Sequence, residues 1–442
     1  MDKIKHQPSR WALAITGALL AVACTTSTYD WRVDFIGNDG EEAEAAAMVV
    51  DEAGNTYVTG LVRQDNQLQQ PRWFINKYDP NGNTLWTQRI DGTVLFGEEV
   101  RGRGKQIQVA GGDLYVLGSL AVPGSSSSAM SVAKYNTDGT REWVYQLPGF
   151  FLNIDFDVTN NAVYLAGSAY IAEDQYRLHT LKLGADASVL WHNQSDYSKL
   201  ILVDVKADSV GGTFVTFRDD LVSTVAYTTE TGSEAWEQSY SVTEKSLEFT
   251  DTTLDTSNNL YAVGHEIPVN SSSAKAVVYK IATDGMVSWN VPVNHSLFYS
   301  IYGKQVAWSN GQVFAAVNGA KLPQEGDVLL AGINDATGVI NWKRTFNGGV
   351  SSIDTPSSLK LTENGEPVLL VNSLIMVPVA GGYTGRAHIT HADGSDGPTA
   401  TVSSFNGADV GIAPDGGLVV MGNNAAIGSD LFKVQVYKFP AE

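Results

Sequence analysis

The 442-residue sequence contains a single cysteine, Cys24, and has few basic residues. With one thiol, neither an intramolecular disulfide nor a zinc site of several thiolates can stabilise the fold. The 29 Lys and Arg residues stand against 48 Asp and Glu, which leaves a formal net charge of −19 at pH 7. So acidic a surface repels nucleic acid and anionic lipid head groups, and we expect no nucleic-acid partner.

Motifs that carry chemistry are also missing. The sequence has no Gly-x-Ser-x-Gly nucleophile elbow and no complete Asp-x-Asp-x-Asp-Gly loop closed by Glu. His388 and His391 form the only close histidine pair. Three positions apart on a strand, they face opposite sides of a sheet, because side chains alternate. We therefore predict no catalytic residue, no cofactor and no metal ion, and we expect that the protein is not an enzyme.

The N-terminus has the pattern of an export signal. Lys3, Lys5 and Arg10 precede an uncharged run from Trp11 to Ala23. That run is shorter than the roughly 20 residues that a helix needs to cross a bilayer. We therefore predict a signal peptide over residues 1–23 that is removed after export.

The end of this signal resembles a bacterial lipobox. Ala21-Val22-Ala23-Cys24 places the lone cysteine directly after the cleavage point. The resemblance implies that Cys24 carries lipid on its sulfur and on its new amino group, with residues 24–29 as a lipidated tether. Thr25, in place of Asp, implies sorting to the outer membrane. The alternative is an ordinary secretory signal followed by an unpaired thiol.

The rest of the chain repeats one pattern. A Trp follows a short turn at six positions, separated by 45 to 57 residues: Trp86, Trp143, Trp191, Trp236, Trp289 and Trp342. The turn Asp79-Pro80-Asn81-Gly82 is typical, because Asn-Gly and Asp-Gly pairs between short strands favour hairpins. A second hairpin, such as the one over residues 49–60, lies upstream of each Trp. Each unit thus predicts four strands, named A to D, with the Trp on strand D.

Four antiparallel strands in about 50 residues are typical of a propeller blade. The last unit ends after its third strand, and Asp30-Trp31-Arg32-Val33 matches the missing fourth. We therefore predict an all-β, eight-bladed β-propeller over residues 30–442, whose last blade is closed by the N-terminal strand. The Trp residues are interpreted as packing between blades. The seventh unit lacks its Trp, and we expect Val402 or a neighbour in its place.

The repeats resemble bacterial β-propeller repeat proteins of the SBBP type and the tryptophan-docking motif of quinoprotein-like propellers, which have eight blades. The adjacent cysteines common in quinone-dependent enzymes are absent here. In outline the chain is also similar to propeller lipoproteins of the outer-membrane β-barrel assembly machinery. The resemblance implies a monomeric, non-catalytic, lipid-anchored protein-binding scaffold that faces the periplasm or, alternatively, the cell surface. The alternatives are a propeller that binds polysaccharide or a small ligand, and an enzyme with an axial site.

Loop lengths indicate where a partner binds. The A–B and C–D turns are short, whereas the B–C loops vary in length and composition, as between Arg63 and Arg72 or between Met376 and Arg386. Variable loops on a rigid scaffold are common binding sites, so we expect a protein partner on that face. Strand D begins at the opposite face, and residues 25–29 reach about 17 Å at most. The lipid is therefore expected to hold the face with the tight turns near the membrane.

Overall fold

The structure, a computed structural model, describes residues 27–37, 41–64, 71–90, 97, 99–124, 128–321, 325–349, 352–375, 382–424 and 433–441. These residues form 32 β-strands and no α-helix. Within them, no helix has the length and apolar character needed to cross a bilayer.

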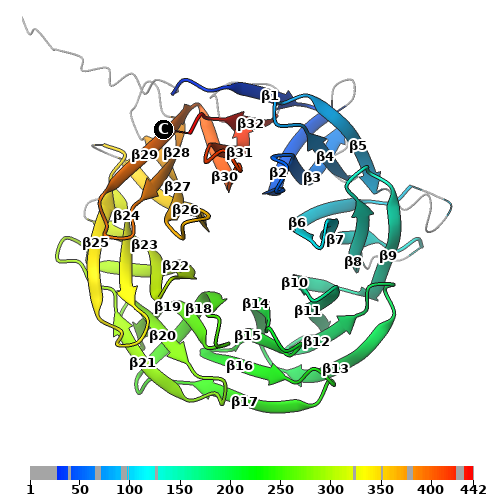
Figure 1. Cartoon of the computed structure of the whole chain (residues 1–442). Coiled ribbons are helices and arrows are strands. Elements are labelled where there is room, and N and C mark those ends of the chain that lie inside the picture. Colours follow the sequence, from blue (N-terminus) through cyan, green and yellow to red (C-terminus); the bar gives the residue numbers. More distant parts are fainter. Residues whose placement is uncertain are drawn as a thin grey trace, which may run out of the picture.

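The strands form eight blades around a central axis (Figure 1). Blades 1 to 7 each contain four consecutive strands. Blade 1 contains β2 (Glu41–Val50), β3 (Thr56–Gln64), β4 (Arg72–Tyr78) and β5 (Thr84–Ile90), and blade 2 contains β6 (Gly102–Ala110), β7 (Asp113–Ala121), β8 (Ser128–Asn136) and β9 (Arg141–Gly149). Blade 3 contains β10 (Phe151–Thr159), β11 (Ala162–Ala172), β12 (Gln175–Leu183) and β13 (Val189–Tyr197). Blade 4 contains β14 (Leu200–Ala207), β15 (Thr213–Asp219), β16 (Val222–Thr228) and β17 (Glu234–Tyr240).

Blades 5 to 7 follow the same order. Blade 5 contains β18 (Lys245–Leu254), β19 (Leu260–Pro268), β20 (Lys275–Ile281) and β21 (Val287–Pro292). Blade 6 contains β22 (Ser300–Ser309), β23 (Gln312–Lys321), β24 (Glu325–Asn334) and β25 (Ile340–Phe346). Blade 7 contains β26 (Ser352–Leu361), β27 (Pro367–Ile375), β28 (Gly382–Thr390) and β29 (Asp396–Ser403). Blade 8 combines both ends of the chain: β30 (Phe405–Ile412), β31 (Leu418–Asn424), β32 (Val434–Lys438) and β1 (Trp31–Phe35).

The pairing of β1 with β32 closes the last blade. The two strands are antiparallel, with Trp31 opposite Lys438 and Phe35 opposite Val434. Figure 1 shows them side by side at the top of the ring. The prediction of eight four-stranded blades, the last completed by the N-terminal strand, is therefore confirmed. Pairing covers a strand edge that would otherwise expose backbone groups.

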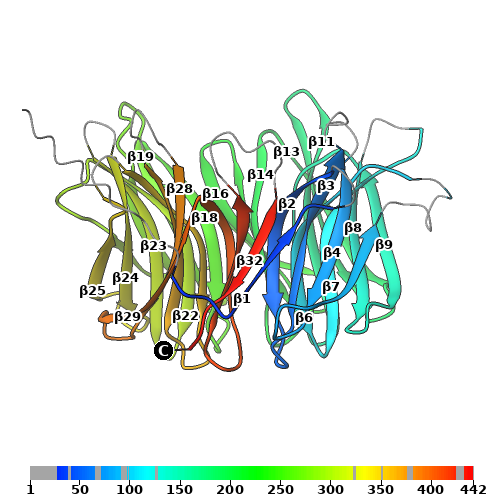
Figure 2. The same ribbon diagram turned by 90° about the horizontal axis from the view of Figure 1, so that it is seen from above.

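Short turns and longer loops lie at opposite ends of the strands, as the sequence predicts. In the turn after β4, the backbone N–H groups of Asn81 and Asn83 donate to Oδ1 of Asp79 at 2.9 and 2.8 Å. Gly82 has a φ of +82°, a conformation that favours glycine. We call this end the tight-turn face, and the end with the B–C loops and D–A connections the variable-loop face. Figure 2 shows the ring from the side, with the C-terminus at the tight-turn face.

The hydrophobic core is divided into eight clusters, one at each seam between successive blades. At the seam between blades 8 and 1, Met48 and Phe74 pack with Val419 and Val436. Burying each such side chain contributes about 1.5–3 kcal/mol. The seam between the first and last blades is thus built in the same way as the others, and the ring is closed.

One sequence expectation is wrong. Val402 does not take the place of the missing Trp in the seventh unit, because it is buried in the core cluster between blades 7 and 8. Trp342 comes four residues after the turn glycine Gly338, and the residue four after Gly394 is Pro398. Pro398 therefore occupies the Trp position of blade 7.

Candidate functional site

Cys24, the predicted lipid-attachment residue, lies outside the described residues. The described chain begins at Ser27, whose N–H donates to the carbonyl of Thr401 at 2.8 Å. The N–H of Thr401 donates back to Ser27 Oγ at 3.0 Å. Because Thr401 lies near the variable-loop end of β29, the chain first runs along the edge of blade 7 and then turns into β1. Backbone groups on the β29 edge thus bind the chain at Ser27, a contact that the sequence did not predict. The expected orientation of the lipid stays a prediction, because residues 24–26 lie outside the described residues.

The predicted partner face is only partly described. Of the variable B–C loops, residues 65–70, 125–127, 322–324 and 376–381 lie outside the described residues, whereas the loop between β19 and β20 lies inside them.

An arc of exposed apolar side chains crosses the variable-loop face over blades 3 to 5 and the connection to blade 6. Its members, here called the apolar arc, are Phe150, Leu152, Tyr170, Ile171, Ile201, Leu221, Val269, Leu297 and Tyr299. Single exposed apolar residues are ordinary on protein surfaces, but a run of them marks an interaction surface. The sequence does not reveal this arc, because its members are scattered over 150 residues of chain.

Blade 3 forms the most prominent part of the apolar arc. Tyr170 and Tyr176 are directly opposite in the β11–β12 hairpin, with ring centroids 5.7 Å apart. Phe150 packs edge-on against Tyr170 at 6.1 Å, and the Tyr170 N–H donates to the Phe150 carbonyl at 2.9 Å. Ile171 beside them is half exposed. This hairpin stands at the variable-loop face in Figure 2. A fixed aromatic group of this kind loses little side-chain entropy when a partner covers it.

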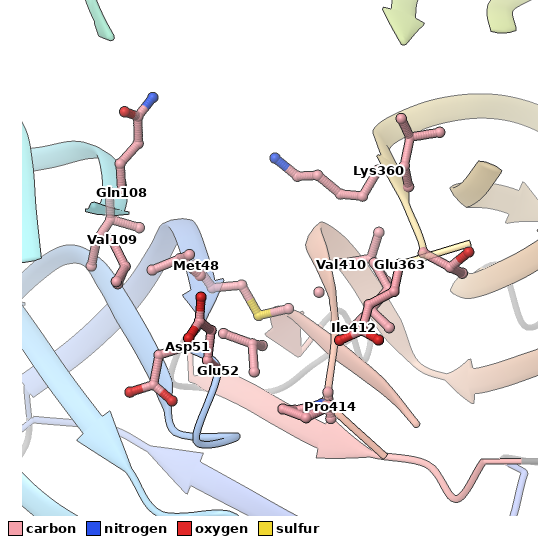
Figure 3. A pocket seen from close by; sticks show the side chains of 17 residues that line it. Met48, Asp51, Glu52, Gln108, Val109, Lys360, Glu363, Val410, Ile412 and Pro414 are labelled. Atoms are coloured by element: carbon pink, nitrogen blue, oxygen red, sulfur yellow. The ribbon is translucent and has the colours of Figure 1, made fainter. Parts of the chain in front are cut away.

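A second feature is a pocket of about 490 Å³ at the tight-turn end of the axis. It is bounded by the inner strands and A–B turns of blades 7, 8, 1 and 2. Figure 3 shows Gln108 and Lys360 reaching into the space from different blades, over a floor that includes Met48 and Val410. None of the described residues that line it is aromatic. The pocket therefore offers one ammonium group, three carboxyl groups (Asp51, Glu52 and Glu363) and an apolar floor, without an aromatic platform on which a sugar ring could stack.

Buried charges lie on the inner strands of blades 3 to 5. Lys206 Nζ donates to Asp204 Oδ1 at 2.6 Å. Burial alone would raise the pKa of Asp204, but the charge of the Lys206 ammonium and the hydrogen bonds from Asp155, Lys206 and Thr252 together outweigh it, so the pKa is lowered. Burial and then the negative charge of Asp204 raise the pKa of Asp155 well above its usual range. The same two causes, in the same order, raise the pKa of Asp251 to about 7.

Perturbed carboxyl groups beside a lysine can belong to an active site, but they also occur in structural networks. Here each carboxylate accepts a backbone N–H from the inner strand of the following blade. These bonds are Val205 to Asp155 (2.6 Å), Thr252 to Asp204 (2.9 Å), Val306 to Asp251 (2.8 Å) and Met48 to Asp409 (3.0 Å). A hydrogen bond contributes about 0.5–1.5 kcal/mol, and about 1.5–3 kcal/mol where the acceptor is charged, as at Asp204. The contacts thus give these aspartates a structural task, which is to join neighbouring blades around the axis.

The six histidines among the described residues lie in several blades. His388 contacts Thr399 and His391 contacts Glu366, so the pair singled out in the sequence has separate partners. The structure instead brings His179 Nδ1 to 3.0 Å from His192 Nε2 across β12 and β13. Across the residues that the structure describes, no group of three or more His, Cys, Asp or Glu side chains is placed to hold a metal ion.

Solved structures resemble this chain in fold at low sequence identity. Sqt1 of Saccharomyces cerevisiae is 12% identical, with 91% of this chain and 97% of that chain covered and a TM-score of 0.50. The periplasmic gluconolactonase PpgL of Pseudomonas aeruginosa is 12% identical, with 78% and 96% covered and a TM-score of 0.47. The quinohemoprotein alcohol dehydrogenase ADHIIG of Pseudomonas putida HK5 is 10% identical, with 79% and 73% covered and a TM-score of 0.42. At this identity the similarity concerns the fold and not the function.

Sequence comparison gives the family. A search of curated proteins finds no significant match. The family model for outer membrane protein assembly factor BamB matches residues 74–316, which is more than half of the chain and runs from blade 1 into blade 6. Together with the eight-bladed, quinoprotein-like ring, this match places the protein: the chain belongs to the BamB family of outer membrane protein assembly factors.

Proposed function

We propose that this protein is a non-catalytic, lipid-anchored scaffold of the outer membrane whose variable-loop face binds another envelope protein. The family name describes an assembly factor, and assembly factors act through protein contacts. The observation that carries the proposal is the apolar arc. Its side chains are held by rigid blades, and they lie on the face where the connections vary.

The size and chemistry of the arc suit a protein partner. A specific interface covers about 800 Å² on each partner, and a few aromatic side chains near its centre supply most of the affinity. Phe150, Tyr170 and Tyr176 form such a centre, and Tyr170 and Ile171 expose 40% and 50% of their surface. The overall negative charge favours a partner with basic residues around its apolar contact.

A second candidate function uses the axial pocket. Its apolar floor, with the Lys360 ammonium and the carboxyl groups of Asp51, Glu52 and Glu363 around it, suits a small, partly apolar ligand that carries a cationic or hydrogen-bonding group. This corresponds to the small-ligand alternative. A polysaccharide is a less suitable ligand for this pocket, because none of the described lining residues is aromatic.

Site-specific photo-crosslinking tests the main proposal. A photoreactive amino acid at Ile171 should crosslink to a partner in intact membranes, whereas the same amino acid at Leu190 should not. Leu190 is a matched control, because it is a similarly exposed aliphatic residue near the tight-turn face of the same blade. The double substitution Tyr170→Ser and Ile171→Ser should weaken capture of the same partner at least tenfold. Equal crosslinking from both positions, or unchanged capture by the double variant, would contradict the proposal.

A further inference from the structure

Seven tryptophans of the ring are docked in the same way. Each lies on an outermost strand, and its indole N–H donates to a backbone carbonyl in the C–D turn of the next blade. The pairs are Trp31 to Pro80 (2.8 Å), Trp86 to Thr137 (3.1 Å), Trp143 to Ala185 (2.8 Å), Trp191 to Glu230 (3.1 Å), Trp236 to Thr283 (2.9 Å), Trp289 to Asp335 (2.9 Å) and Trp342 to Ala392 (2.8 Å). The repetition defines a slot whose shape and polar contact suit an indole.

Three side chains of one blade occupy each typical slot. In blade 1, Tyr57 of β3 lies 6.0 Å from Trp86 between ring centroids. The Lys77 ammonium lies over the Tyr57 ring at 5.0 Å, and Lys77 is opposite Trp86 in the sheet. A glycine in the turn of the next blade covers the indole, as Gly139 covers Trp86. The slot is therefore filled by a Tyr, a Lys and a Trp that are stacked beneath a turn.

Blade 7 has lost all three side chains. Pro398 takes the Trp position, and the register of the sheets places Ile389 and Val368 where other blades have Lys and Tyr. Blade 8 also has no continuous C–D turn to cover the slot, because its strands C and D are β32 and β1, which do not follow one another in the chain. Its place is taken by residues 439–441 on one side and 27–30 on the other.

A cavity of about 330 Å³ lies at this seam. Its walls include Ser27, Thr28, Ile389, Pro398, Leu418 and Phe439. The size is within the range of small-molecule sites, which begins near 300 Å³. The walls combine apolar side chains with the hydroxyl groups of Ser27, Thr28 and Thr399. The Thr28 hydroxyl can accept an indole N–H. The cavity thus lies where the other seams hold a Trp, and it offers both apolar walls and a hydrogen-bond acceptor.

We propose that this slot binds the indole side chain of a partner polypeptide. This chain has ten tryptophans, and one of them, Trp11, belongs to the predicted signal peptide. Seven are docked at other seams, Trp73 is fully buried, and Trp308 donates to Asp335 Oδ2 at 2.9 Å. No tryptophan among the described residues, in this copy or a second one, is left to fill the slot. The occupant therefore comes from a different protein.

Binding of N-acetyl-tryptophan amide to the full-length protein tests the slot. We expect saturation-transfer NMR to detect one site with a Kd on the order of 1 mM, the affinity of a small fragment. Pro398→Trp fills the slot from within and should weaken binding at least tenfold while raising the midpoint of thermal unfolding. Leu190→Trp adds an exposed indole on the same face and should leave binding unchanged. Trp342→Ala opens the equivalent slot at the neighbouring seam and should create a second site.

Two measurements keep the test independent of how Pro398→Trp folds. Crystals soaked in 5-bromotryptophan amide should show the bromine anomalous signal between Pro398 and Phe439. In sedimentation velocity, the wild type and Pro398→Trp should both remain monomeric. Absence of probe binding at 10 mM, bromine only at other positions, or unchanged binding to Pro398→Trp would overturn the proposal. Self-association of the wild type that Pro398→Trp abolishes would also overturn it, in favour of a second copy. Because the slot lies far from the apolar arc, its failure would leave the proposed function standing.

Discussion

The indole N–H of Trp31 donates to the carbonyl of Pro80 at 2.8 Å and so joins blade 8 to blade 1. The two residues are 49 positions apart in sequence, and this contact closes a ring of 32 strands. Trp31 also begins β1, the strand that completes blade 8 by pairing with β32. One side chain therefore takes part both in the completion of the last blade and in its docking to the first.

Replacement of Trp31 should destabilise the protein more than replacement of an internal docked Trp. Trp31→Ala and Trp236→Ala each remove one indole and its hydrogen bond, and we expect each to lower the free energy of unfolding by about 2–4 kcal/mol. Trp31→Ala should in addition release β1, because only that variant loosens a chain end. Urea unfolding and hydrogen exchange in β32 measure the two effects. Equal exchange rates in β32 for both variants would argue against the special role of Trp31.

The turn glycines should tolerate no side chain. Gly82 has a φ of +82°, and a Cβ there would lie 2.7 Å from the Trp31 ring. Gly82→Ala should therefore cost about 2–4 kcal/mol, which combines backbone strain and the clash. Blade 3 offers the reverse experiment, since Ala187 occupies the same turn position at a φ of +65°. Ala187→Gly should stabilise the protein by about 0.5–1 kcal/mol. Thermal and urea unfolding of both variants check the opposite signs.

The pKa of Asp251 gives a pH dependence with a defined sign. Burial and then the charge of Asp204 raise it to about 7, whereas an unfolded Asp titrates near 3.9. The folded state thus binds the proton more tightly, so the contribution of Asp251 to stability is complete below about pH 4 and is lost as the pH rises through about 7. Asp251→Asn should remove this loss, because the amide oxygen can still accept the Val306 N–H.

Urea unfolding at pH 5 and pH 8 checks this prediction. The unfolding free energy of Asp251→Asn minus that of the wild type should increase by about 1–3 kcal/mol when the pH is raised from 5 to 8. A difference between wild type and variant that stays constant across this range would mean that Asp251 titrates normally in the folded protein.

The lipid-anchor prediction depends on Cys24 alone. Cys24→Ser removes the sulfur that would carry the lipid, and we expect the protein to move from the membrane fraction into the soluble envelope fraction. Intact mass spectrometry should show acyl groups on the wild type only. Membrane retention of the Cys24→Ser protein without acylation would show that protein contacts, and not a lipid, hold it there.

Local patterns made much of the fold predictable. The turn at Asp79 to Gly82 and the Trp that follows it repeat often enough to count the blades, and the match between Trp31 and Trp86 predicts the closure. The expectation for Val402 was wrong because the hydrophobicity of a residue does not tell which position of the strand it occupies. The Trp position lies four residues after the turn glycine, and a β-bulge in the strand fixes that spacing. The path of Ser27 was missed because it depends on a free strand edge 374 residues away.

The candidate sites were less accessible to sequence reasoning. Phe150 and Tyr170 are ordinary strand residues in the sequence, and only the hairpin geometry joins them at one end of blade 3. His179 and His192 are 13 positions apart and were passed over in favour of the closer pair. Neither relation follows a short period, so neither leaves a signal in the sequence.

The sequence by itself determined the repeat, the turn chemistry, the number of blades and the candidate lipid site, because these depend on residues that are neighbours along the chain. The tertiary structure decided which surfaces are available. It placed the apolar arc on one face, engaged the buried aspartates between blades and left a cavity of about 330 Å³ beside Pro398. The physical reason is that a ring brings together residues hundreds of positions apart, and which of them remain unpartnered depends on packing around the whole ring.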